Sequence, residues 1–291
     1  MRKIIALSML SVLMLGVATW AQNGPPKILQ ITREDVKAGK GPAHNAYEAR
    51  WTQAATKVDP TPYIGMTSMN STEAWWISGY DSFASLEKAG GNSALNRVMD
   101  SFAPGDSEYI NSNRTMTLRF REDLSYGADQ PLGDAHGFVI RTVRLRVGHD
   151  QDFEQVRKLV KEAVARTDAK PRSVVYQVVA GAPNGTFLVF TPFKSLAERD
   201  NTAMGDAIGQ ALGDEGRAKI AELQNRGYNS TDDQIFMFNP SFSNPSADMR
   251  AAAPDFWKPK ATMAKAAAPT GAKPATSAAK APEKEKAKAG K

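Results

Sequence analysis

The segment 73–80 carries bulky apolar side chains on both of its sides, which predicts a strand buried on both faces. Trp76 projects to one side while Trp75 and Ile77 project to the other, because successive side chains of a strand alternate between its faces. Asp81 or Ser82 then occupies a position suited to a helix N-cap, and apolar residues recur three positions apart after it. The pattern therefore predicts a strand that runs directly into a helix.

This strand and helix return later in the chain, at 185–200, in a weaker form. There, Phe193-Lys-Ser-Leu-Ala aligns with Tyr80-Asp-Ser-Phe-Ala, and Lys194 replaces the acidic residue near the cap. A match of five residues is weak by itself, but the predicted strands and helices around both segments also follow the same order, as in an internal repeat. We therefore expect two copies of one α+β unit.

Each copy is predicted to follow the order β-α-β-β-α-β, the ferredoxin-like arrangement. The first has strands at 27–32, 63–69, 74–80 and 115–121, helices at 43–56 and 82–99 with an interruption at Gly90-Gly91, and a helix or turn at 105–113. The second has strands at 138–147, 173–179, 187–191 and 234–238, and helices at 151–166, 195–212 and 215–225. The predicted parts are a signal peptide at 1–21, domain 1 at 24–123, a linker at 124–135, domain 2 at 136–243 and a disordered tail at 244–291.

The N-terminus has the layout of a secretory signal peptide. Arg2 and Lys3 precede an apolar run at 4–17, and small residues follow, so that cleavage is expected after Ala18 or Ala21. A retained membrane anchor is the alternative, although the run is short for a span of about 20 residues. The sequence contains no Cys, which excludes disulfides, and we expect a periplasmic or secreted protein of a bacterial type.

The net charge of +6 arises from the two ends of the chain. The N-terminal pair contributes +2 and the Ala-, Lys- and Pro-rich segment 258–291 contributes +7, which leaves −3 for residues 22–257. A mildly acidic body argues against nucleic-acid binding. The tail could bind an acidic envelope polymer or lipid headgroups, or it could be a solvated spacer.

Taken together, the order of elements and the Gly-Tyr-Asp-Ser-Phe segment at 79–83 resemble the dimeric α+β barrel superfamily, particularly its NIPSNAP-like and antibiotic-biosynthesis-monooxygenase-like members. The resemblance covers 27–242 and rests on architecture rather than on specific motifs. It implies two four-stranded sheets packed face to face, here within one chain, so that a monomer with an internal pseudo-dimer is expected. It also implies a cofactor-independent oxygenase as one alternative function.

Two arginines on predicted strands are candidates for ligand binding. Arg119 and Arg144 lie on the polar sides of 115–121 and 138–147, and if the apolar sides meet helices, both arginines approach the cleft between the sheets. With Trp76 or Trp75 nearby, they could bind a carboxylate or phosphate attached to an apolar body. Alternatively, they are solvated or paired at strand ends.

A second candidate constellation lies on the predicted helix 43–56. His44, Tyr47, Glu48 and Trp51 share one stripe at helical spacing, where a His one turn from a Glu could act as an acid or base. The alternative is an ordinary amphipathic helix with the tryptophan in the core.

Other chemistries have little support. Only three His are present and none is at ligand spacing, so neither a metal nor a cofactor is expected. There is also no nucleophile motif. Three functions remain open: binding of a small apolar or anionic molecule in the cleft between the sheets, an oxygenase-like enzyme, and a non-catalytic interaction protein of the envelope. A filled cleft would favour the last.

Overall fold

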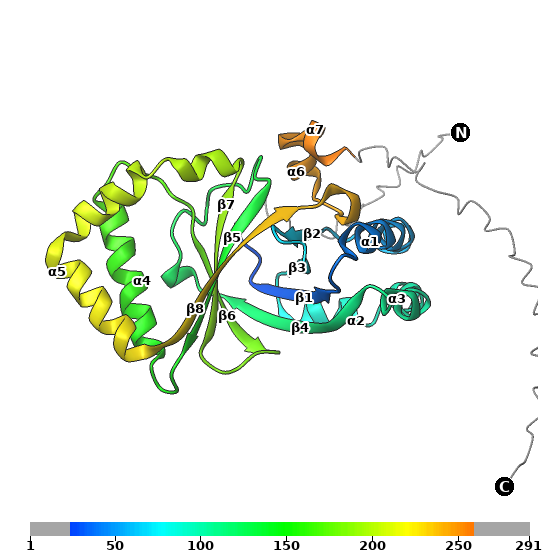
Figure 1. Ribbon diagram of the computed structural model, residues 1–291, viewed down its shortest axis with the longest axis horizontal. Coiled ribbons are helices and arrows are strands. Elements are labelled where there is room, and N and C mark those ends of the chain that lie inside the picture. Colours follow the sequence, from blue (N-terminus) through cyan, green and yellow to red (C-terminus); the bar gives the residue numbers. More distant parts are fainter. Residues whose placement is uncertain (1–23, 259–291) are drawn as a thin grey trace, which may run out of the picture. The chain divides into compact units, whose positions relative to one another are not determined.

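The computed structural model describes residues 24–258, and these form two consecutive β-α-β-β-α-β halves (Figure 1). The strands of the first half are β1 (Ile28–Val36), β2 (Tyr63–Ser68), β3 (Glu73–Tyr80) and β4 (Ile110–Phe120), and its helices are α1 (Gly41–Ala55), α2 (Phe83–Gly90) and α3 (Ser93–Asp106). The second half contains β5 (Gly137–Leu145), α4 (Asp150–Ala165), β6 (Val174–Ala180), β7 (Thr186–Phe193), α5 (Ala203–Gly227) and β8 (Tyr228–Phe238).

The eight strands form one closed antiparallel barrel. Around it the order is β1-β3-β2-β8-β5-β7-β6-β4, so that each half contributes four adjacent strands in the same relative order. The halves meet twice, where β2 pairs with β8 and where β4 pairs with β6. This strand order confirms the predicted tandem ferredoxin-like fold and the internal pseudo-dimer.

Side chains fill the interior of the barrel, between the four strands of one half and the four strands of the other. Trp75 of β3 is 1% exposed and packs 4.6 Å, centroid to centroid, from the ring of Phe236 of β8. Leu118 of β4 and Tyr176 of β6 belong to the same apolar cluster and are fully buried. Because the inner faces interdigitate in this way, the space between the sheets is a packed core and not the ligand cleft that the sequence suggested.

The helices cover the outer faces of the barrel. Trp76, on the side of β3 opposite to Trp75, packs with Val36 and Phe242. In the second half, Phe153 of α4 packs against Phe187 of β7. The expectation that 73–80 is buried on both faces is therefore confirmed.

The segment after β8 corrects the prediction of disorder from residue 244. It forms a 3-10 turn (Pro240–Phe242) and the short helices α6 (Ala247–Ala252) and α7 (Pro254–Trp257). Met249 and Trp257 enter the barrel's core cluster, and the Ser243 hydroxyl bonds both the N–H and the C=O of Gly65 in β2. These contacts order the segment despite its bias toward Ala and Pro.

Some boundaries also differ from the predicted ones. β4 starts at Ile110, within the segment expected to be a helix or turn. The helix expected at 195–212 begins only at Ala203, and it continues as α5 through a break at Gly213, where φ is +66°. The signal peptide and the tail beyond residue 258 lie outside the described residues. Within 24–258, no helix is long and apolar enough to cross a membrane.

Candidate functional site

A pocket of about 470 Å³ lies between the outer face of the first half's sheet and the helices α1, α2 and α3. Alternate residues of β1, namely Gln30, Thr32 and Glu34, face it, because Leu29 and Ile31 point into the barrel. Aromatic side chains make up much of its wall: Tyr47, Trp51, Tyr63, Trp76, Tyr80 and Phe102. The pocket is thus formed within one half and not between the two.

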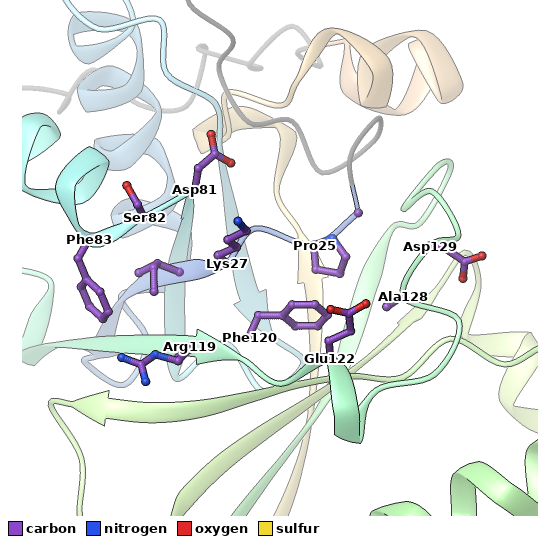
Figure 2. Close-up of a pocket in the computed structure, with 12 residues that line it drawn as sticks. Pro25, Lys27, Asp81, Ser82, Phe83, Arg119, Phe120, Glu122, Ala128 and Asp129 are labelled. Carbon is purple, nitrogen blue, oxygen red and sulfur yellow. The ribbon is translucent and has the colours of Figure 1, made fainter.

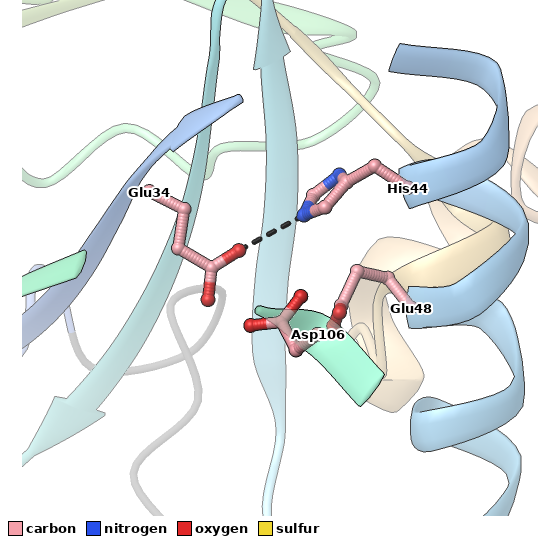
Figure 3. Close-up of side chains that lie close together, drawn as sticks. All are labelled: Glu34, His44, Glu48 and Asp106. Carbon is pink, nitrogen blue, oxygen red and sulfur yellow. Dashed lines mark hydrogen bonds and ion pairs between the residues drawn. The ribbon is translucent and has the colours of Figure 1, made fainter. Parts of the chain in front are cut away.

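Four potential metal-ligating or acid-base side chains converge at one side of this pocket (Figure 3). Glu34, His44, Glu48 and Asp106 each place one ligand atom within 4.8 Å of the others. The Nε2 atom of His44 lies 2.9 Å from Oε2 of Glu34. The chain therefore brings together one imidazole and three carboxyl groups from three separate elements, and we call this group the acidic cluster.

Local structure explains how these residues meet. His44 and Glu48 are four positions apart on α1, so they share one face of the helix. Asp106 is the last residue of α3, and the Tyr47 hydroxyl ties α1 to α3 by donating to the carbonyl oxygen of Phe102 over 2.6 Å. The edge of the His44 ring packs against Trp76 with a centroid distance of 6.0 Å.

Three residues of the acidic cluster are buried and Asp106 is partly exposed, and burial changes the protonation of the cluster. The exposed fractions are 0% for His44, 6% for Glu48 and 7% for Glu34. Burial, supported by the charge of Asp106, raises the pKa of Glu34 to about 8, and burial with the charge of Glu34 raises the pKa of Glu48 to about 9. Burial also raises the pKa of Asp106 and lowers that of His44. A buried carboxyl group whose pKa is raised toward neutral pH is suited to accepting or donating a proton, or to binding a cation.

The structure gathers five of the seven residues proposed from the sequence, Glu48 among them. Tyr47, Trp51 and Trp76 line the pocket, and His44 lies in the acidic cluster beside it. The alternative of an ordinary amphipathic helix with its tryptophan in the core is partly right too. Trp51 packs against Tyr63, with 5.7 Å between the ring centroids.

The two arginines lie elsewhere. On β4, Met116 and Leu118 point into the barrel and not toward the helices, so Arg119 faces outward, and its guanidinium lies 5.6 Å from the ring centroid of Phe83. Arg144 is in β5, in register with Thr186 and Ser230 of the second half. The proposed grouping of both arginines with Trp76 is therefore wrong, because the apolar sides of these strands do not all face helices.

Arg119 instead borders a different depression of about 800 Å³ (Figure 2). Lys27, Asp81 and Glu122 also line it, so charges of both signs are spread along its wall. It contains no convergent group comparable to the acidic cluster, and we do not assign it a function.

The sequence reasoning missed Glu34 and Asp106. The first predicted strand ended at residue 32, whereas β1 continues to Val36. Asp106 lay in a segment of undecided structure. The available signal was the alternation of Leu29 and Ile31, which extends to place Glu34 on the helix-covered side of β1.

Solved structures of several proteins have a similar fold. A candidate monooxygenase from Lactobacillus acidophilus NCFM is 8% identical with a TM-score of 0.45, and the match covers 72% of this chain and 93% of that one. An anthrone oxidase-like protein is 11% identical with a TM-score of 0.47, covering 75% and 93%. A chlorite dismutase from Candidatus Nitrospira defluvii is 8% identical with a TM-score of 0.45, covering 80% and 96%.

These are similarities of fold at low identity, and we take no activity from them. No family model matches the chain, and no curated protein matches it. The functional argument therefore rests on the pocket and the acidic cluster themselves.

Proposed function

We propose that the protein binds a small molecule with an apolar body and no negative charge in the pocket of its first half. The observation that carries this proposal is the aromatic-walled cavity of about 470 Å³ beside a buried acidic cluster. Its volume lies in the range of about 300–1,000 Å³ typical of sites for small molecules and cofactors. Aromatic walls with a few convergent polar groups are the usual composition of such sites.

The composition of the pocket favours an uncharged or cationic ligand over the anionic class that the sequence left open. Among the described residues that line it, none is Lys or Arg, whereas five carry carboxyl groups: Glu34, Glu48, Asp59, Asp100 and Asp106. An anion would have to lose its hydration next to these groups without a cationic partner. A neutral or positively charged ligand meets no such penalty, and the aromatic rings also favour a cation.

Ligand-observed NMR with three small probes tests the proposal: indole as a neutral molecule, benzylamine as a cation and benzoate as an anion. We expect binding of indole or benzylamine and at least tenfold weaker binding of benzoate. Ser78→Phe, which adds a ring to the pocket wall on β3, should weaken binding at least tenfold. The same change at Ser230 of β8, outside this lining, is the matched control. Absence of binding by both favoured probes, or binding indifferent to Ser78→Phe, contradicts the proposal.

The other two functions remain predictions. The filled barrel interior is what the interaction-protein interpretation expects, but the pocket on the outer face supplies a binding site that the interpretation does not need. An oxygenase-like reaction rests on the resemblance alone. Native mass spectrometry of the mature protein, before and after denaturation, would reveal a retained molecule or a second subunit and so bear on all three.

We also propose that the protein acts outside the cytoplasm, in the periplasm or as a secreted protein. The support is the basic and apolar pattern of residues 2–17 with small residues after it. N-terminal sequencing of the protein from its native host should give a start after Ala18 or Ala21. A start at residue 1 or 2 contradicts export by a cleaved signal.

A further inference from the structure

We propose that Glu34, His44, Glu48 and Asp106 bind a divalent first-row transition metal ion at the side of the pocket. This goes beyond the proposed binding of a small molecule, because it assigns an inorganic ligand to the acidic cluster whether or not the aromatic part of the pocket is filled. The argument rests on the geometry of the donor atoms, on a buried polar atom that lacks a partner and on the kinds of donor present.

The geometry is close to that of a coordination shell. Nitrogen and carboxylate oxygen ligands lie about 2.0–2.2 Å from zinc-like ions, so neighbouring donors around a tetrahedral ion are roughly 3.4 Å apart. The four candidate donor atoms lie within 4.8 Å of one another. The most distant donors must therefore approach by about an ångström to surround a common ion, and Figure 3 shows all four side chains directed toward the same space.

Burial supplies a second argument. Glu48 is 6% exposed, and its carboxyl group lies with those of Glu34 and Asp106 around one space. Buried carboxyl groups require hydrogen-bond donors, protons or a cation. His44 contacts Glu34 through Nε2, while the buried Oδ1 atom of Asp106 has no hydrogen-bond partner within residues 24–258, which a bound cation would supply.

The donor set selects the class of ion. The described cluster holds carboxyl oxygens and one imidazole nitrogen, and the chain has no Cys to supply thiolates. Carboxylates alone would suit Mg²⁺ or Ca²⁺, whereas the fully buried imidazole favours ions such as Zn²⁺, Fe²⁺ or Mn²⁺. Glu34, Glu48 and Asp106 also line the pocket, so an ion held by them would border the space available to a small molecule.

Calorimetric titration of the chelator-treated mature protein with Zn²⁺, and separately with Mg²⁺, tests this inference. We expect one Zn²⁺ per chain and at least tenfold weaker binding of Mg²⁺. Glu48→Gln and His44→Gln should each weaken Zn²⁺ binding at least tenfold, because each removes one donor or its charge. Glu87→Gln removes an exposed acid on α2 and should leave binding unchanged. No Zn²⁺ binding by the wild type, or binding that survives both cluster variants, overturns the proposal.

Thermal unfolding shows whether a variant has lost the site or lost the fold. Without metal, Glu48→Gln should melt at the wild-type temperature or above it, because it removes an uncompensated buried acid. With saturating Zn²⁺, the wild type should gain thermal stability that the variant does not gain. An equal gain in both proteins contradicts the proposal and indicates that shared protons alone balance the cluster.

The test is separable from that of the proposed function. Ser78→Phe changes the pocket wall and none of the four donors, so it should abolish probe binding and leave Zn²⁺ binding intact. Zn²⁺ binding without probe binding would contradict only the small-molecule proposal. Probe binding without Zn²⁺ binding would contradict only the metal site.

Discussion

The two halves of the barrel share one topology but use the layer between sheet and helices differently. In the second half, Phe153 of α4 lies 4.5 Å from the ring centroid of Phe187, and Val143 and Val175 complete an apolar cluster there. In the first half, the layer beneath α1 and α3 contains the aromatic pocket. The same scaffold thus has a packed core on one side and a cavity on the other.

Buried acids follow the same division. Asp152 at the start of α4 is 5% exposed, and it accepts hydrogen bonds from Arg226, over 3.1 Å to Nε, and from His149. Its pKa falls to about 2, mainly because Arg226 bonds to it. Glu34 and Glu48 of the first half have no such arginine. Arg226 therefore neutralises Asp152 within the fold, whereas Glu34 and Glu48 lie beside the pocket without an arginine. The first half does pair another buried acid, Glu73, with Arg33 over 2.6 Å, so the contrast applies to the layer beneath the helices.

The largest expected difference between the halves is in packing. Phe153→Ala should lower the free energy of unfolding by about 3–5 kcal/mol, because it opens a cavity in a filled core. Trp51→Ala should cost clearly less, since this half-buried ring borders space that is already open. Urea denaturation of both variants measures the difference. Equal costs would mean that the pocket side is packed as tightly as the core side.

The next effect is the response of the acidic cluster to alkaline pH. The folded-state pKa values of Glu34 and Glu48, about 8 and about 9, lie above the usual value near 4.5. The protonated acids therefore favour the fold fully below about pH 4.5, and this contribution is lost as pH rises toward 9. Asp106, whose pKa is also raised, acts in the same direction, whereas burial lowers the pKa of His44, so its charging disfavours the fold as the pH falls.

Glu48→Gln in the chelator-treated protein tests this response. It should raise the free energy of unfolding at about pH 9 by about 1–3 kcal/mol, because it removes a buried charge. The change near pH 5 should be much smaller. Urea denaturation across this range gives the profile, and a variant profile parallel to that of the wild type contradicts the assignment.

The smallest expected effect is on the pH of acid unfolding, and it concerns Asp152 in the second half. The pKa of Asp152 is depressed, so its contribution to stability is present above about pH 4 and is lost as the pH falls toward 2. Arg226→Gln removes the main cause of this depression and should move acid unfolding to a higher pH. Arg217→Gln, on the same helix but bonded to the fully exposed Asp214, is the control. Identical acid midpoints for both variants would show that Arg226 does not protect Asp152.

The hydrophobic pattern and its repetition were enough to predict the duplicated fold, because the apolar residues on both sides of 73–80 and in its later copy indicate strands that are buried on both faces. It could not show which face of a strand meets helices. In a closed barrel both faces of a strand are covered. The sequence analysis placed Arg119 in the interior, whereas Met116 and Leu118 of the same strand point there. Sequence spacing also cannot reveal that Glu34 and Asp106 lie close together, because they are far apart along the chain and meet only through the tertiary fold.

The C-terminal segment shows a different limit. Its composition resembles that of a disordered tail, and composition averages over the few large residues that matter. Met249 is 1% exposed and Trp257 is 6% exposed in the barrel's core cluster. Two anchors in a run of small residues are enough to hold a short helical segment against the fold.

The barrel's two seams have a consequence for refolding. Among the strands that the structure describes, the halves pair where β2 meets β8, over Met66 to Ser68, and where β4 meets β6. Each half therefore carries two strand edges that the other half covers, and a chain opened at both seams exposes all four. Two such chains can exchange halves and rebuild the same pairings between molecules, as in domain swapping. Refolding at rising protein concentration should accordingly convert monomers into dimers whose barrels are each completed by two different chains.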